Sequence, residues 1–166
     1  MAISTATHVQ HIAAPAGAVW DVISAAGYLE ECHPFCAANP VDEWPGVGSQ
    51  DRIEYYNGRK ITRHFIAWEE GAGYDIEITD ANGPVANVVW RLADEGAGST
   101  LTITITPQMP GHLPTVVRWA RDTIIVRPML VRYLRSVMAG IEWRVTTGRP
   151  VQRNQFGAHR WFSPAA

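Results

Sequence analysis

The chain has 166 residues, of which 46% are hydrophobic and 18% are charged, and its formal net charge is −2 at pH 7. This length suits one domain with a sizeable core, and the composition excludes an intrinsically disordered chain. The 14 basic residues do not gather into a tract, so we expect no nucleic-acid binding, which requires a positively charged face.

The opening segment, Met1 to Thr7, lacks the apolar region of a signal peptide, and no apolar stretch reaches the ~18 residues that span a bilayer. We therefore expect Cys32 and Cys36 to be free thiols in a reducing compartment. Lys60 is the single lysine among the basic residues, which is typical of a GC-rich genome. These features predict a cytoplasmic bacterial protein with no membrane span.

The first quarter of the chain predicts one strand and two helical segments. His8 to Ala13 has the pattern of a short strand. Pro15 suits a first helical turn, and the apolar stripe of Ala16 to Ala26 ends at Gly27, a residue typical of helix C-termini. A second short helix or turn follows from Tyr28 to Cys32.

Further strands occupy the middle of the chain. Ala37 to Trp44 is predicted as one strand, and Asp51 to Tyr56 and Arg59 to Glu69 form a hairpin around Asn57-Gly58, the strongest short hairpin signal. Three runs of alternating apolar and polar residues then fill positions 73–106, so each strand has one dry face and one wet face. A meander with one dry face needs a cover.

A long helix after the meander is the predicted cover. It begins at Pro114 or Thr115 and runs to about Thr147, where Gly148 ends it. Pro128 lies inside this span, so we expect a kink or break near Val126. A curved antiparallel sheet around one long helix cannot collapse completely, and we expect a cavity between them.

The element order and four short segments give the chain a family resemblance, and these segments are Ile12 to Asp21, Cys32 to Phe35, Gly48-Ser49 and Gly98 to Thr106. It resembles the SRPBCC superfamily of START-like, helix-grip proteins related to the birch pollen allergen. The resemblance implies an α+β helix-grip fold, in which a curved antiparallel sheet of about seven strands surrounds a long C-terminal helix and two short helices follow the first strand. The resemblance covers roughly residues 6 to 147, and we predict one domain over residues 1–148, with 149–166 as a tail that packs on it or extends from it.

A charged pair is the main polar candidate at the cavity wall. Similar sequences often place an arginine on the strand after the Gly-Ser turn and a glutamate on the next strand, whereas the matching positions here hold Asp51 and Arg63. A two-residue turn would pair Asp51 with His64, whereas a loop one residue longer or shorter would put Arg63 on the same face as Asp51. The resemblance favours Arg63 inward. We expect a structural ion pair in preference to direct ligand contact, and keep both residues as ligand-binding candidates.

Aromatic residues supply the other pocket candidates. Tyrosine and tryptophan join a large apolar body to a polar tip, which suits a pocket that needs a few polar groups. For Trp90, core packing is the favoured role, whereas Tyr55 and Tyr74 lie nearer strand ends. At the start of the long helix, Arg118 could attract an acidic ligand, although a solvated position is the commoner role of such arginines. The full set of predicted ligand-binding residues is Asp51, Tyr55, Arg63, Phe65, Tyr74, Trp90, Arg118 and Trp119.

The segment Cys32-His33-Pro34-Phe35-Cys36 holds metal-ligand residue types, but no second pair of ligands accompanies it. Adjacent cysteine and histidine residues also rarely reach the geometry of a nucleophilic pair. We therefore predict no metal site and no cofactor, and identify no catalytic residue.

Three functions fit these observations. The favoured one is binding of a hydrophobic or aromatic small molecule, including lipids, in the internal cavity. The alternative is a polyketide cyclase or dehydratase-like enzyme that uses the same cavity, and the third is an interaction module of the co-chaperone kind. A homodimer is a possible assembly. A buried histidine or carboxylate with a perturbed pKa would favour the enzyme, and an exposed apolar patch on the outer sheet would favour the interaction module.

Overall fold

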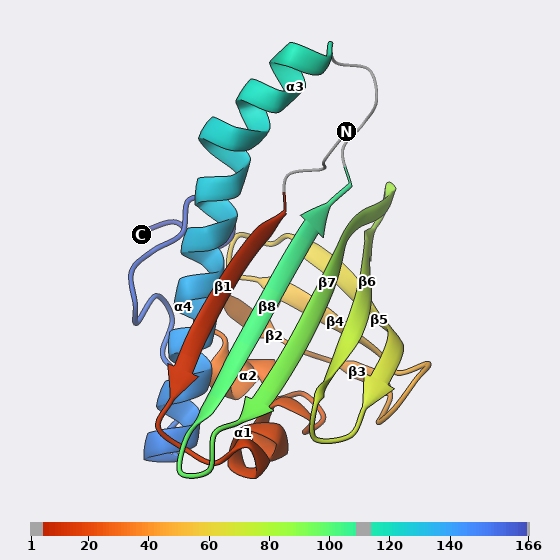
Figure 1. Ribbon diagram of the computed structural model, residues 1–166. Coiled ribbons are helices and arrows are strands. Elements are labelled where there is room, and N and C mark those ends of the chain that lie inside the picture. The colour runs from red at the N-terminus through yellow and green to blue at the C-terminus, as the bar shows by residue number, and fades with distance from the viewer. Residues whose placement is uncertain (1–4, 109–113, 166) are drawn as a thin grey trace.

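The computed structural model describes residues 5–108 and 114–165 (Figure 1). The elements follow the predicted order, and the α+β helix-grip fold is confirmed. In chain order they are β1 (Ala6–Ile12), α1 (Ala16–Ile23), α2 (Leu29–Cys32), β2 (Cys36–Ala38), β3 (Val41–Glu43), β4 (Gln50–Tyr55), β5 (Lys60–Glu69), β6 (Gly73–Asp80), β7 (Gly83–Asp94), β8 (Ser99–Pro107), α3 (Thr115–Arg121), the π-helical turn η1 (Asp122–Val126) and α4 (Arg127–Thr147).

One antiparallel sheet of eight strands forms the body of the protein. Its order is β1-β8-β7-β6-β5-β4-β2, with β3 also paired to β4. The alternation predicted for β8 is confirmed, since Leu101, Ile103 and Ile105 are buried while the threonines between them are partly exposed. This alternation gives the sheet a concave apolar face, which the helices cover.

The last helix, α4, packs against the concave side of the sheet, and α1 and α2 lie at one end of it (Figure 1). Its buried face includes Leu134, Met138 and Ile141. Gly140 allows the closest approach, because a Cβ at this position would lie 2.0 Å from the carbonyl oxygen of Cys32 in α2. This backbone-to-backbone contact fixes α4 beside α2.

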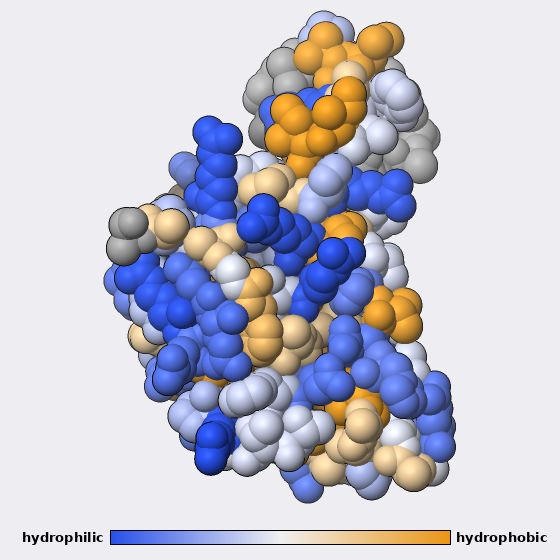
Figure 2. All heavy atoms as spheres, turned by 90° about the vertical axis from the view of Figure 1, so that its left-hand side faces the viewer, coloured by the Kyte–Doolittle hydropathy of each residue, from blue (hydrophilic) through white to orange (hydrophobic). Residues whose placement is uncertain are grey.

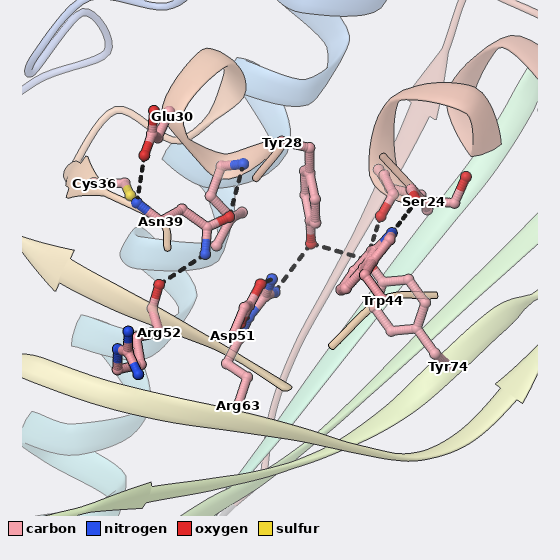
Figure 3. A network of polar contacts seen from close by, with 12 residues as sticks. Ser24, Tyr28, Glu30, Cys36, Asn39, Trp44, Asp51, Arg52, Arg63 and Tyr74 are labelled. Carbon is pink, nitrogen blue, oxygen red and sulfur yellow. Dashed lines mark hydrogen bonds and ion pairs between the residues drawn. The ribbon is translucent and has the colours of Figure 1, made fainter. Parts of the chain in front are cut away.

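The single strand predicted from Ala37 to Trp44 is wrong in one respect, since it is two short strands separated at Asn39 and Pro40. At this break, Asn39 makes hydrogen bonds that take the place of the interrupted strand pairing. Its amide nitrogen Nδ2 donates to the carbonyl of Arg52 at 2.7 Å, and its backbone N–H donates to Glu30 Oε1 at 2.7 Å (Figure 3). The sheet consequently has eight strands where the sequence predicted about seven.

The hairpin between β4 and β5 settles which residue faces Asp51. The backbone N–H of Tyr55 donates to the carbonyl of Arg59 at 2.8 Å, so the loop has three residues and Gly58 takes the left-handed conformation at its end, with φ of 86°. This loop is one residue longer than the Asn57-Gly58 turn. It places Asp51 opposite Arg63, as the resemblance favoured, and His64 opposite Gln50.

A kink or break was predicted near Val126, but the helix does not break there, and a π-helical turn occupies Asp122–Val126 instead. The chain keeps right-handed helical dihedrals through η1, where the turn widens to the π form. Pro128 then falls in the first turn of α4, where its missing N–H is tolerated. Above this turn, α3 extends past the end of the sheet (Figure 1).

The segment after Gly148 packs back onto the body. The backbone N–H of Val151 donates to the carbonyl of Glu31 at 2.8 Å, and that of Asn154 donates to the carbonyl of Pro34 at 3.0 Å. His159 and Phe162 are buried. The C-terminal segment is therefore part of the wall around the internal cavity.

Candidate functional site

A cavity of about 330 Å³ lies between the concave face of the sheet and α4. Every strand from β4 to β8 contributes apolar lining, for example Ile53, Ile61, Ile76, Val88 and Ile103. The helical side supplies Leu130, Leu134 and Val137, and the C-terminal segment supplies Trp161 and Phe162. The lining is therefore mostly aliphatic and aromatic, as is usual for small-molecule sites.

The exposed lining residues mark the mouth of the cavity. They are Arg59 at the β4–β5 hairpin, Gln108 after β8 and Arg121 at the end of α3. Two of these three side chains are cationic. Their positive charge would attract an acidic group of a ligand at this mouth.

The opposite end of the concave face is filled by aromatic rings. Phe65 lies 5.0 Å from Trp44 and 5.1 Å from Tyr74, measured between ring centroids, and Tyr74 lies 5.3 Å from Trp68. Phe65 and Tyr74 were predicted to line the pocket, but they do not, because these rings occupy the space beside them. Of the predicted aromatic residues, Tyr55 and Trp90 do line the cavity.

Asp51 and Arg63 form the predicted ion pair. Arg63 donates from Nε to Asp51 Oδ1 at 2.7 Å and from Nη2 to Oδ2 at 2.5 Å, and the exposed fractions of the side chains are 3% for Arg63 and 0% for Asp51. The Arg63 guanidinium also lies over the rings of Tyr28 and Phe65, at 5.3 and 5.1 Å from their centroids. Burial alone would lower the pKa of Arg63, but its contacts with Tyr28 and Asp51 outweigh burial and raise it.

A chain of hydrogen bonds continues from this pair into the core (Figure 3). Arg63 Nη1 donates to the Tyr28 hydroxyl at 3.0 Å, and the Tyr74 hydroxyl donates to the carbonyl of Ile23 at 3.1 Å. The 2.8 Å bond between the two hydroxyls must then use the Tyr28 proton, since a phenol has only one. Both phenol protons are therefore engaged inside the protein, which is typical of a structural network.

A second network lies on the cavity wall and connects His33, Tyr133 and Tyr55. The backbone N–H of Phe35 donates to His33 Nδ1 at 3.1 Å, so this nitrogen carries no proton. Burial, and then the charge of Arg63, lower the pKa of His33 from 6.5 to about 3, so the ring is neutral and its proton lies on Nε2. Nε2 therefore donates to the Tyr133 hydroxyl at 2.8 Å.

The second network contains one more O–H donor than its hydrogen bonds use. The hydroxyls of Tyr133 and Tyr55 lie 3.1 Å apart and share one hydrogen bond, which uses one of their two protons. The other O–H has no acceptor among the described side chains, and both tyrosines line the cavity. Burial raises the pKa of Tyr55 to about 12 and that of Tyr133 above its ordinary value, so both phenols keep their protons.

Arg63 adds to this excess of donors. A guanidinium has five N–H bonds, of which three have hydrogen-bond acceptors among the described residues. Arg63 lines the cavity, whereas its carboxylate partner Asp51 does not, and the described lining residues include no Asp or Glu. The enclosed polar wall therefore presents more hydrogen-bond donors than acceptors.

Arg118 and Trp119 were predicted as ligand-binding residues, but neither lines the cavity. Trp119 is 60% exposed, because α3 extends beyond the sheet and has no apolar face to cover. The arginine from this helix that does line the mouth is Arg121, one turn further along.

Cys32 and Cys36 are buried free cysteines. Burial raises the pKa of both thiols, to about 12 for Cys36, so neither is a reactive thiolate at neutral pH. Within residues 5–108 and 114–165, no cluster of three or more His, Cys, Asp and Glu side chains could hold a metal ion.

His33, Tyr133 and Phe162 line the cavity but were not predicted as site residues. His33 belongs to the Cys-His-Pro-Phe segment that carried the family resemblance, so its position there was an available signal. Tyr133 belongs to the apolar stripe of the long helix. Phe162 belongs to a C-terminal segment whose return to the body no local pattern predicts.

Residues 4–147 match the family described as polyketide cyclase/dehydrase and lipid transport, and the chain belongs to this family. A comparison with curated proteins gave no match. Within the described part of the chain, no helix is long and apolar enough to cross a membrane.

Solved structures of similar fold include DynU16, a protein from the dynemicin biosynthetic locus, with a TM-score of 0.68 and 15% identity. That match covers 89% of this chain and 49% of DynU16, so the chain spans about half of that protein's length. Ara h 8.0201 matches with a TM-score of 0.62 and 15% identity over 85% of this chain and 96% of that one. The Aha1 dimer from Colwellia psychrerythraea matches with a TM-score of 0.65 and 10% identity over 87% of this chain and 97% of that one. These likenesses show the shared fold.

Proposed function

We propose that the protein binds a compact, apolar or aromatic small molecule that carries a hydrogen-bond acceptor oxygen, such as a ketone or quinone. The observation that carries this proposal is the enclosed wall of the cavity, where an apolar lining surrounds a surplus of donors from Arg63 and the Tyr55–Tyr133 pair. An acceptor oxygen in the cavity would satisfy these donors, and a buried donor without a partner costs free energy.

The size of the cavity supports a compact ligand. Its volume of about 330 Å³ is near the lower end of the ~300–1,000 Å³ range of small-molecule pockets. A fused ring system with few substituents suits this space better than a lipid with two acyl chains.

The protonation states favour binding over catalysis. A general base works best when its pKa is near the operating pH, whereas the pKa of His33 is about 3. A phenol with a pKa of about 12, as in Tyr55, is a hydrogen-bond donor at neutral pH and a poor acid. Neither group therefore fits a proton-transfer role at neutral pH.

The surplus tyrosine proton also favours a second candidate, a cyclase or dehydratase-like enzyme. A phenol O–H held beside a ketone would polarise its carbonyl group and stabilise the enolate that precedes ring closure. The family description, which includes polyketide cyclases, supports this candidate. Conversion of an aromatic polyketide in the presence of the protein would favour it over binding alone.

Filling the cavity tests the proposed site. Ile76 is buried and lines the cavity, so Ile76→Trp should abolish uptake of a fluorescent apolar probe such as anilinonaphthalene sulfonate. Ile66 on the neighbouring strand is 55% exposed, and Ile66→Trp is the matched control that should bind the probe like wild type. Circular dichroism checks that both variants are folded. If a folded Ile76→Trp protein retains the probe, the ligand site is not this cavity.

A further inference from the structure

The helix that follows β8 exposes a cluster of large apolar side chains. This cluster, the α3–η1 face, consists of Val116, Val117, Trp119, Ile124 and Ile125, with exposed fractions between 51% and 75%. Figure 1 shows that α3 extends past the sheet, and Figure 2 shows apolar surface gathered at this end of the molecule. Single exposed apolar residues are common on protein surfaces, but five on one short segment are not.

The α3–η1 face reverses the usual pattern of a surface helix. In a globular protein the apolar stripe faces the core and polar residues face water. Here Asp122 is 6% exposed, whereas Ile124 and Ile125, two and three residues later, face solvent. Exposure of these apolar side chains to water costs free energy, and a surface that covered them would remove that cost.

The segment that carries this face and the start of α4 are rich in arginine. Residues 114–135 contain five arginines and one carboxylate, Asp122. The whole chain has 14 basic and 16 acidic residues, which leaves nine basic and 15 acidic residues outside this segment. The chain therefore concentrates positive charge beside its exposed apolar side chains while the remainder is acidic.

We propose that the α3–η1 face docks on an anionic lipid surface. Exposed isoleucine, valine and tryptophan flanked by arginine are the composition of segments that lie in a membrane interface. Anionic headgroups would attract the arginines, at about a fivefold gain in binding for each one near the surface. A second copy of the chain fits less well, because it would bring two strongly cationic segments together.

The position of the cavity gives this docking a use. Arg121 and Val126, at the two ends of the η1 turn, both line the cavity. A docked α3–η1 face would bring the mouth to the lipid, and an apolar ligand could pass between bilayer and cavity without crossing water. This last step depends on the proposed function, whereas the docking does not.

Vesicle binding by the full chain tests the docking with no cavity ligand present. We expect the protein to co-sediment with vesicles of equimolar phosphatidylcholine and phosphatidylglycerol at least about fivefold more tightly than with phosphatidylcholine alone. Binding should weaken between ~0.1 M and ~1 M salt, as the Debye length falls from ~10 to ~3 Å.

Matched variants then test the face itself. Val116→Ser combined with Ile124→Ser should weaken vesicle binding at least about tenfold, because burial of each side chain contributes more than the free energy of such a factor. The control combines Val47→Ser with Ile66→Ser, the same residue types at positions 70% and 55% exposed on the body, and should bind like wild type.

Three results would overturn the proposal. The first is absence of binding to the anionic vesicles. The second is an equal loss of binding in the test and control variants. The third is a concentration-dependent dimer in size-exclusion chromatography that the test variant abolishes while vesicles are not bound, which would assign the face to self-association. The four substituted side chains are exposed, so all variants should keep the wild-type circular dichroism spectrum.

Discussion

Replacing Asp51 by asparagine removes one charge of the buried pair while keeping the size of the side chain. Arg63 would remain charged, because a guanidinium is not deprotonated in proteins, and its side chain is 3% exposed. Asparagine can accept only one of the two hydrogen bonds that Arg63 donates to Asp51. An uncompensated charge in such a site typically costs ~3–5 kcal/mol of stability.

Urea unfolding measures this loss. With a slope of ~1–3 kcal/mol per molar urea, Asp51→Asn should lower the unfolding midpoint by at least about 1 M. The matched control is Asp42→Asn, which breaks the 2.9 Å pair of Asp42 with Arg52, whose side chains are 38% and 44% exposed. An exposed pair contributes ~0–1 kcal/mol, so the control should shift the midpoint slightly. Equal and small shifts in both variants would refute the claim that the Asp51–Arg63 pair is isolated from water.

Two further predictions concern the helix contact and the histidine. Gly140→Ala should destabilise the protein strongly, because the new Cβ would lie 2.0 Å from the carbonyl oxygen of Cys32. In the control Gly17→Ala in α1, the new Cβ meets nothing within 4 Å, so this substitution should stabilise the protein by roughly 0.5–1 kcal/mol. Equal melting temperatures for the two variants would contradict this packing of α4 on α2. His33 should keep its proton on Nε2 and stay neutral from pH 8 to pH 5 in nitrogen-15 NMR spectra, since its pKa is about 3. Because the unfolded histidine binds a proton below pH ~6.5, His33 should contribute a loss of stability as pH falls from ~6.5 toward 3. Protonation of folded His33 above pH 5 would contradict its burial.

Much of the fold could be predicted because its signals are local. Strand alternation at Leu101, Ile103 and Ile105 assigned the faces correctly, and Gly148 marked the helix end. The hairpin loop could not be assigned in the same way. Asn57-Gly58 suits a two-residue turn and equally the last two positions of a three-residue loop, and only the bond between Tyr55 and Arg59 distinguishes them.

The candidate site was harder to predict because it depends on contacts between distant segments. Alternation shows that Phe65 and Tyr74 face inward, but not that neighbouring tryptophans fill the space beside them. His33 and Tyr133 are 100 residues apart and meet only when α4 crosses α2. The orientation of α3 likewise depends on where the sheet ends, which the helical period of Trp119 and its neighbours does not reveal.

The central claim is that the cavity selects an apolar molecule with an acceptor oxygen. Acetylnaphthalene and isopropenylnaphthalene have the same shape and differ in a carbonyl oxygen against a methylene group. Competition with a bound fluorescent probe measures both affinities in wild-type protein. A hydrogen bond from Tyr55, Tyr133 or Arg63 should favour the ketone by ~1 kcal/mol or more, which is at least about fivefold. Equal affinities, or tighter binding of the hydrocarbon, would contradict the donor surplus on which the proposed function rests.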